Sequence, residues 1–358
     1  MLESYSVFHI LKEIGLYIID MVSTRFLSLN DSEIAYHYLL INIIGFTFLL
    51  RLGLSCDYIR NKRPSGKNLT FREVYKSIFS KEVFFSRSFC VDMGIFFTNI
   101  IMFAFLSVLI TDTIIHPESF LLEKLNFFWI NMLGPHPYIK IDSFVLNIIF
   151  TSILFITYEL LYYFSHRAFH NIPILWQFHK VHHSATHLSF MTDNRFHIVE
   201  SLVLFFYMGF AAAFSKSICV YLFGDLPIVI AVNGIMLHYA ILYSLTLAQH
   251  SNLWISFRRF DYLIVSPAMH ITHHSTDPVN FNTNYALNLA TLDYVFGTFK
   301  KSETIPPENL KIGLGANEEE NFAWENASLL DYFVWPFKEV FNLLDQKIGA
   351  KKSTKMIR

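Results

Sequence analysis

Long apolar runs constrain this chain more than any other feature of its sequence. Five of them lie at about residues 35–54, 89–112, 143–165, 198–221 and 226–249. Each is close to the roughly 20 apolar residues that a helix needs to cross a bilayer. Charged residues make up 16% of the chain, whereas a soluble domain usually has about 25%. We therefore predict an all-α polytopic membrane protein with about five transmembrane helices.

The positions of lysine and arginine predict how these spans are oriented. With five spans, one side of the membrane receives all but five of the 28 Lys and Arg residues, including those of the connector at 51–88. The five on the other side are Lys12, Arg25, Lys124, Lys140 and Lys216. Because cytosolic loops are enriched in basic residues, we predict that the basic side faces the cytosol.

Three segments outside the spans carry further predictions. A short stretch around Lys216–Asp225 predicts a turn that joins the fourth and fifth runs into a helical hairpin. Residues 6–22 predict an amphipathic helix or a short extra span. Residues 328–348 have apolar positions at helical spacing, which predicts a helix on the membrane surface. Pro336 is expected to kink or divide that helix.

Charge and cysteine content argue against several classes of partner and site. The formal net charge is −1, which gives no sign of a polyanionic partner such as nucleic acid. Cys56, Cys90 and Cys219 lack CxxC spacing, so neither a thiolate metal site nor a disulfide framework is expected. The first residues lack the pattern of a removable signal peptide.

Histidine is concentrated in two windows on the side predicted to be cytosolic. Eleven of the 16 histidines lie in 166–197 and 250–274. HxxxH occurs at 166–170, and HxxHH occurs at both 179–183 and 270–274. Residues three and four apart share a helix face, so each box is predicted to aim two or three imidazoles at one point. Imidazole binds iron, zinc, copper and nickel. Eight or nine ligands are too many for one ion, which predicts two metal ions with about four ligands each.

Residues outside the boxes are candidates for orienting the ligands. His187 and His197 could lie beside the site or at the surface, and His238 is expected to pack within the fifth span. Ligating histidines usually need a partner, often a carboxylate, that fixes their tautomer. The candidate carboxylates are Glu159, Asp193, Glu200, Asp277 and Asp293. Glu159 ranks first, because an acid inside a membrane span is functional by default.

The stretch from Tyr158 to Phe299 resembles the fatty acid hydroxylase / sterol desaturase superfamily. The resemblance is carried by YELLYYFSHRAFH, LWQFHKVHHS, RFH, QHSN, SPAMHITHHS and TNYALNLATLDYVFGTF. The last segment is similar to a late family signature, through Asn284, Tyr285, Asp293, Phe296, Gly297 and Thr298. Glu159 stands where the family often has Asp, and Ala286 stands where it often has Gly.

The resemblance implies a membrane-embedded diiron oxygenase that uses O2 as co-substrate. Members hydroxylate or desaturate C–H bonds of sterols, fatty acyl chains, alkyl ethers or carotenoids. Carried over by position, the metal ligands are His166, His170, His179, His182, His183, His250, His270, His273 and His274. Residues expected beside them are Glu159, Arg195, His197, His187, Asn284 and Asp293. No catalytic residue beyond the ligands is predicted.

The resemblance also suggests the domain organisation. Residues 1–140 are expected to form an N-terminal membrane region, 141–300 the catalytic domain with a cytosolic helical cap, and 301–358 a cytosolic tail with an interfacial helix. The protein is predicted to be multi-pass, in a bacterial inner membrane or the endoplasmic reticulum, with its site facing the cytosol.

Electrons for such a reaction are expected to come from a separate protein. The sequence has no haem-binding HPGG segment and no Gly-rich dinucleotide loop, so we predict no bound haem, flavin or NAD. A b-type cytochrome, ferredoxin or reductase is expected to dock on the basic cytosolic face, to which an acidic partner would be steered.

Several alternatives remain open at this point. Hydroxylation is favoured over desaturation, although the boxes do not distinguish the two reactions. A membrane metallohydrolase would use HExxH, but Arg167 occupies the position of that Glu. A metal-binding protein without catalysis, such as a carrier, would place ligands along a path inside the bilayer.

Overall fold

The computed structural model describes residues 79–113, 117–224, 245–251, 253–303, 306–315 and 326–356, together with 70, 72, 75–76 and 324. The segments predicted at 6–22 and 35–54 lie outside the described residues, as does most of the fifth run. In the described part the regular structure is helical, with one isolated β-bridge between Ser275 and Ile312 and no strand. The all-α prediction therefore holds for this part of the chain.

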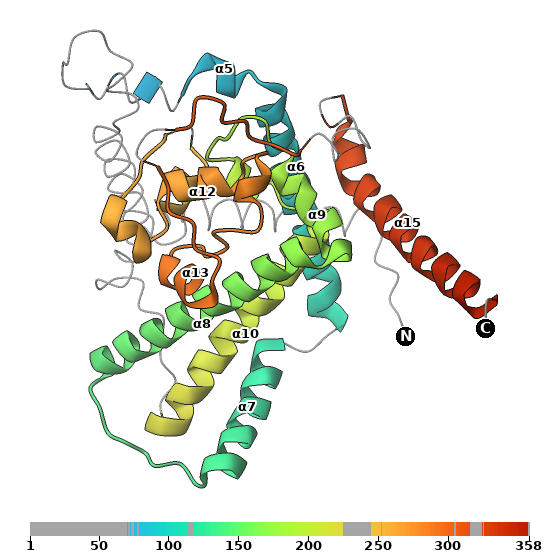
Figure 1. Ribbon diagram of the computed structural model, residues 1–358. Helices are drawn as coiled ribbons and strands as arrows, with labels where there is room; N and C mark the ends of the chain where they lie inside the picture. Colours follow the sequence, from blue (N-terminus) through green and yellow to red (C-terminus); the bar gives the residue numbers. More distant parts are fainter. Residues whose placement is uncertain are drawn as a thin grey trace. The chain divides into compact units, whose positions relative to one another are not determined.

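Figure 1 labels the main helices of the described residues. They are α5 (Lys81–Phe84), α6 (Arg87–Thr113), α7 (Pro117–Leu133), α8 (Ser143–Asn171), α9 (Pro173–His183), α10 (Ile198–Phe223), α12 (Pro267–His273), α13 (Ala290–Phe296) and α15 (Leu329–Met356). Short 3-10 turns, η2 (Thr192–Asn194), η3 (Arg258–Tyr262) and η4 (Pro278–Asn280), lie between them.

The contacts divide the chain into two compact units. One, here the apolar unit, comprises Met1–Leu49, Phe97–Leu161 and Val203–Ser244. The other, here the histidine-rich unit, comprises Leu50–Phe96, Tyr162–Leu202 and Leu245–Arg358. Helices α6, α8 and α10 each contribute residues to both units.

Two of the predicted spans, at 143–165 and 198–221, are helices long and apolar enough to cross a membrane. These are α8 and α10, and only 22% and 33% of their most apolar stretches are buried. The run at 89–112 is also helical, as α6. The predicted turn at Lys216–Asp225 is wrong at its start, because Lys216 lies within α10, which continues to Phe223 and is followed by Gly224 at a φ of 79°.

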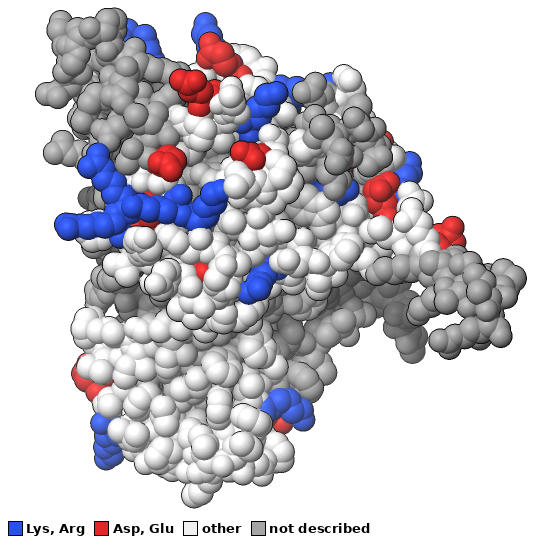
Figure 2. Space-filling model, in the orientation of Figure 1, with Lys and Arg blue, Asp and Glu red and all other residues white. Residues whose placement is uncertain are grey.

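An apolar cluster and a hydrogen bond link the helices of the apolar unit. Leu146 and Phe150 of α8 pack against Cys219 of α10. Trp129 of α7 donates a hydrogen bond to Ser217 Oγ at 3.0 Å. Large side chains such as Phe127 point outward, 67% exposed. Figure 2 shows few charged side chains over these helices. Exposed apolar patches of this kind mark membrane or protein contacts.

In the histidine-rich unit, local sequence signals start and stop the short helices. Pro173 opens α9, and Ile172 before it is extended, because a proline ring disfavours the helical conformation in the residue that precedes it. Ser266 caps α12 by accepting a hydrogen bond from the Met269 backbone N–H. Gly297 ends α13 in the left-handed conformation.

The C-terminal helix α15 packs against α9. Tyr332 is buried in a core that includes Val181 of α9 and Trp324. The helix is continuous through Pro336; of the two outcomes predicted for Pro336, a kink or a division, division is therefore wrong.

Candidate metal centre

The nine histidines carried over from the family resemblance lie in two clusters within the histidine-rich unit. Site A contains His166, His170, His179, His183 and His273. Site B contains His182, His250, His270 and His274. In each cluster one nitrogen from every imidazole lies within 4.8 Å of all the others. The two clusters contain five and four histidines, where two groups of about four were expected.

Four segments between residues 166 and 274 supply these side chains. The end of α8 carries His166 and His170. All three histidines of the second box lie on α9. The third box lies on α12, with His274 as its C-cap. His250 follows the helical residues 245–249. Both sites are therefore assembled by tertiary packing.

Each HxxHH box is divided between the two sites. In the box at 179–183 the outer pair belongs to site A and His182 to site B. In the box at 270–274 the outer pair belongs to site B and His273 to site A. On a helix, positions i+3 and i+4 lie about 100° apart around the axis, so one box naturally faces two points. Two imidazoles of each HxxHH box therefore face one site, within the predicted two or three, and the remaining imidazole faces the other site.

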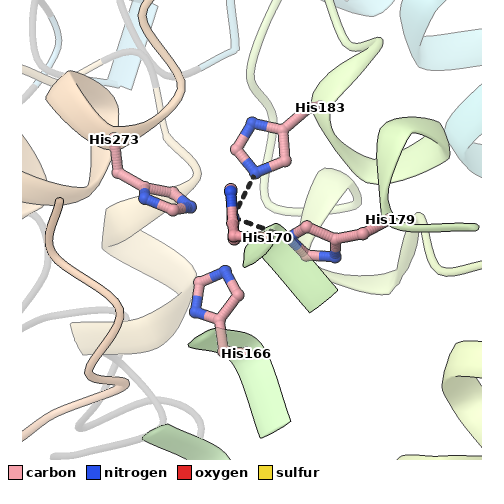
Figure 3. Close-up of side chains that lie close together, drawn as sticks. All are labelled: His166, His170, His179, His183 and His273. Atoms are coloured by element: carbon pink, nitrogen blue, oxygen red, sulfur yellow. Dashed lines mark hydrogen bonds between the residues drawn. The ribbon is translucent and has the colours of Figure 1, made fainter. Parts of the chain in front are cut away.

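The imidazoles of site A converge through their Nε2 atoms (Figure 3). Nε2 of His170 lies 3.1 Å from Nε2 of His179 and 3.2 Å from Nε2 of His183. Nε2 of His166 and Nε2 of His273 are buried without a hydrogen-bond partner within the described part of the chain. Figure 3 shows the five rings directed at a common point.

The opposite nitrogens of three site A rings are held by the protein. Nδ1 of His166 lies 2.8 Å from the Tyr285 carbonyl oxygen, and Nδ1 of His273 lies 2.7 Å from that of Thr283. Nδ1 of His179 lies 2.7 Å from Glu200 Oε1. A carbonyl or carboxylate at Nδ1 accepts a hydrogen bond from the Nδ1–H group, which keeps the proton on Nδ1 and leaves the Nε2 lone pair free for a metal.

Site B also converges through Nε2, but its Nδ1 atoms are not held in the same way. Nε2 of His250 lies 3.3 Å from that of His182 and 2.9 Å from that of His270. All four Nδ1 atoms are buried and form no hydrogen bond within the described residues. The nearest acid is Asp193, whose Oδ1 lies 3.3 Å from Nδ1 of His250 without hydrogen-bond geometry.

Burial keeps these imidazoles neutral. It is the main cause that lowers the pKa of His179, His182, His183, His270 and His274 well below the usual value, and neighbouring histidines lower each pKa further. The pKa of His273 falls to about 4, because burial outweighs its bond to the Thr283 carbonyl. Neutral imidazoles are the form that binds metal.

The donor set fits metal ions better than it fits an ordinary hydrogen-bond network. Neutral imidazoles that meet through Nε2 have too few protons to form a hydrogen bond at every contact. The Nε2 atoms of His166 and His273 have no hydrogen-bond partner in the described part of the chain. A buried nitrogen left unpaired costs about 1–3 kcal/mol. A cation at each point would accept all the lone pairs, and iron, zinc, copper and nickel all suit imidazole.

Comparison with known proteins agrees with this geometry. The family model for fatty acid hydroxylases matches residues 151–298. The matched region contains all nine clustered histidines. The superfamily resemblance drawn from the histidine boxes is thereby confirmed.

Three relatives illustrate the range of this family. The chain is 29% identical over 45% of its length to an ornithine lipid hydroxylase of Rhizobium tropici, over 44% of that protein. It is 27% identical over 38% of its length to an alkylglycerol monooxygenase of Xenopus tropicalis, over 28% of that protein. It is 28% identical over 40% of its length to a very-long-chain aldehyde decarbonylase of Oryza sativa subsp. indica, over 22% of that protein. The matches thus span less than half of each relative. No solved structure matches the chain significantly.

Within the matched region, the late signature supports the rings indirectly. Asp293 is buried and accepts hydrogen bonds from the backbone N–H groups of Tyr285 and Ala286 at 2.7 and 3.0 Å. This fixes the peptide whose carbonyl faces His166. Burial raises the pKa of Asp293 to about 6. Ala286 has no positive φ, so its replacement of the family glycine requires no strained backbone.

Asn284 fixes the same segment from its other side. It adopts a left-handed φ of 57°, which asparagine tolerates better than most residues. Its side chain donates to the carbonyls of Met269 and Lys300 and accepts from the Lys300 N–H. The segment that follows α12 is thereby tied to the helix that carries the third box.

Arg195 holds the end of α9 rather than a metal. Its guanidinium donates to the Val181 carbonyl and to Ser184 Oγ, at the C-terminal end of the helix that carries the second box. It also forms a buried ion pair with Asp92 Oδ1 at 2.8 Å. Asp92 was missed at the level of sequence, although an acid at the start of an apolar run was a usable signal.

The remaining candidates are members of neither cluster. His187 is exposed. His197 accepts a hydrogen bond from the Val199 N–H at Nδ1 and donates from Nε2 to the Phe333 carbonyl, so both of its nitrogens are engaged. Asp277 caps η4. Glu159 is buried in α8. Of the predicted carboxylates, Glu200 is the one that contacts a site A ligand.

Proposed function

We propose that this chain is a membrane-bound oxidoreductase that uses two iron ions and O2 to hydroxylate a C–H bond of a lipid. One observation carries the proposal: the region that matches fatty acid hydroxylases gathers nine imidazoles, eight of them buried and that of His170 partly buried, into two sets of metal-ligand geometry. Iron bound at sites A and B would supply the activation of O2 that oxidation of an unreactive C–H bond requires.

The residues of the chain have three tasks in this proposal. The clustered imidazoles present their Nε2 lone pairs to the two ions. Glu200, with the carbonyls of Tyr285 and Thr283, orients the site A rings and fixes their tautomers. Burial of the clusters excludes bulk water, which protects a reactive centre from side reactions.

We further propose that the substrate is a lipid with a long acyl or alkyl chain, or a sterol. The named relatives act on ornithine lipid, alkylglycerol and very-long-chain aldehyde, and these share a long hydrocarbon chain. Two helices long and apolar enough for a bilayer support membrane association. A lipid substrate could then reach the centre from the membrane in which it is dissolved.

The electrons for the reaction must come from another molecule. We propose a separate donor, a b-type cytochrome, ferredoxin or reductase, that docks on the basic side of the chain. The charge distribution of the sequence supports this part of the proposal, because opposite charge steers such encounters.

The test is lipid analysis of cells that express the full chain with iron and a redox partner. We expect a lipid species that has gained one oxygen atom and is absent when His179→Ala replaces the wild-type chain. Loss of two hydrogen atoms without a gain of oxygen would instead identify a desaturase. Hydrolysed lipid without oxidation would favour a metallohydrolase, and unchanged lipids with metal bound would favour a non-catalytic protein.

A further inference from the structure

One face of α15 is apolar and exposed, although the helix packs on the protein along another face. Its members are Leu330, Val334, Phe337, Phe341 and Leu344, which follow one another at intervals of four and three residues. This spacing places them in one stripe along a helix, here called the outer stripe. Leu330 and Phe341 are 69% and 70% exposed, which is costly in water for side chains of this size.

The other two faces of α15 are of different character. Tyr332 and Pro336 are buried, and the Tyr332 hydroxyl donates to the Trp324 carbonyl at 2.7 Å. Lys338, Asn342 and Asp345 are exposed and polar. At about 100° per residue, the buried face, the polar face and the outer stripe occupy three separate sectors. The helix therefore offers one sector to the protein, one to water and one to a third, apolar medium.

We propose that the outer stripe of α15 is seated in the interfacial layer of a lipid bilayer with anionic headgroups. Phe and Leu side chains beside a polar face are typical of helices that lie in this layer. Residues 346–358 contain Lys347, Lys351, Lys352, Lys355 and Arg358 and no acidic residue, which suits an anionic surface. A bilayer is also the apolar medium that α8 and α10 of the same chain are long enough to cross.

Lipid contact at α15 would bear directly on the metal sites. Phe337 stacks edge-on against Phe178, the residue before His179, with ring centroids 5.2 Å apart. The Phe333 carbonyl accepts the hydrogen bond from His197. Because α15 also packs on α9, a lipid-seated α15 would hold three of the histidines at a fixed depth. The lipid contact itself does not depend on the proposed chemistry.

Spin labels on the full chain test this contact. The chain, with Cys56, Cys90 and Cys219 replaced by alanine, is reconstituted in nanodiscs of phosphatidylcholine and phosphatidylglycerol. A label is placed at Phe341→Cys, and the matched control is its polar neighbour, Asn342→Cys. We expect the label at 341 to collide more with O2, which dissolves in lipid, than with a water-soluble nickel chelate, and the label at 342 to show the reverse.

A second stripe position keeps the test decisive if one variant does not fold. Val334→Cys should behave like Phe341→Cys, and removing phosphatidylglycerol should reduce lipid exposure at both. Equal access of the nickel chelate to 341, 334 and 342 would overturn the proposal. Close label–label coupling at 341 without O2 accessibility would overturn it in favour of contact between two copies. Unchanged lipid exposure without anionic lipid would refute the headgroup preference.

Discussion

Sites A and B contain the same kind of ligand but are supported differently. In site A, three of the five rings have Nδ1 held by Glu200 or a backbone carbonyl. In site B, all four Nδ1 atoms lack a hydrogen bond within the described residues. The difference teaches that convergence of ligands and orientation of ligands are separate properties. Site A has both, whereas site B relies on packing and on the ion itself to fix its rings.

Adjacent residues of the third box provide the largest test of this division. His273→Ala should remove the ion of site A alone, and His274→Ala that of site B alone, because the two rings face different points. Metal analysis should find one ion per chain instead of two in each variant, and lipid oxidation should be lost in both. His187→Ala, an exposed histidine outside both clusters, should change neither. Loss of both ions in each single variant would contradict this division and would show that the two clusters act as one site.

Replacing Arg195, which supports both sites, should have an effect nearly as large. Arg195 fixes the end of α9, whose histidines serve both sites. Arg195→Met leaves Asp92 buried without its partner, which should cost about 3–5 kcal/mol. We expect a lower thermal unfolding midpoint in detergent and weaker metal binding at both sites. The exposed Arg259→Met is the control, and selective loss of one site would contradict a shared role.

A pair of acids separates the sites more finely. Glu200→Gln removes the carboxylate from His179 and should weaken metal binding at site A by roughly 10- to 100-fold. Asp193→Asn should have a smaller effect on site B, because Asp193 makes no aligned hydrogen bond to His250. Competition with a chelator measures the metal affinity of each variant. An effect of Asp193→Asn equal to or larger than that of Glu200→Gln would contradict the proposed difference in support between the sites.

Acidity should affect the two sites alike and is the smallest test of the contrast. The pKa of His273 in site A is about 4, against 6.5 when exposed, and burial also lowers the pKa of His274 in site B. Below pH 6.5 these histidines are therefore protonated in the unfolded chain but stay neutral in the folded protein. Stability of the metal-free protein should fall as pH is lowered from 6.5 toward 4. A thermal unfolding midpoint that does not change between pH 6.5 and 4 would show that the clustered imidazoles are not desolvated in the folded protein.

The sequence predicted which histidines lie close together but not how the two clusters divide them. The HxxHH spacing is local and identifies helix faces, so the ligand candidates could be named. Whether His182 joins His179 or His250 depends on how α9 and α12 pack, which local spacing does not specify. The predicted turn around Lys216–Asp225 was wrong at its start, because Lys216 still lies within α10, which ends at Phe223.

The supporting residues were harder to predict than the ligands. The carbonyls of Thr283 and Tyr285 hold two rings, but a backbone carbonyl has no signature in a sequence. Asp293 could be named as a candidate, yet it acts through the peptide of Tyr285. Glu159 ranked above Glu200 because of its position in an apolar run. The structure instead pairs Glu200 with His179, through a contact between α9 and α10.

The most direct measurement is the metal content and ligand environment of the purified full chain after reconstitution with iron. Elemental analysis with X-ray absorption should show two iron ions per chain in a shell of imidazole nitrogens, falling to one ion in His273→Ala and in His274→Ala. A wild-type chain that holds no iron after reconstitution, or binds it through oxygen or sulfur ligands alone, would contradict the assignment of both sites.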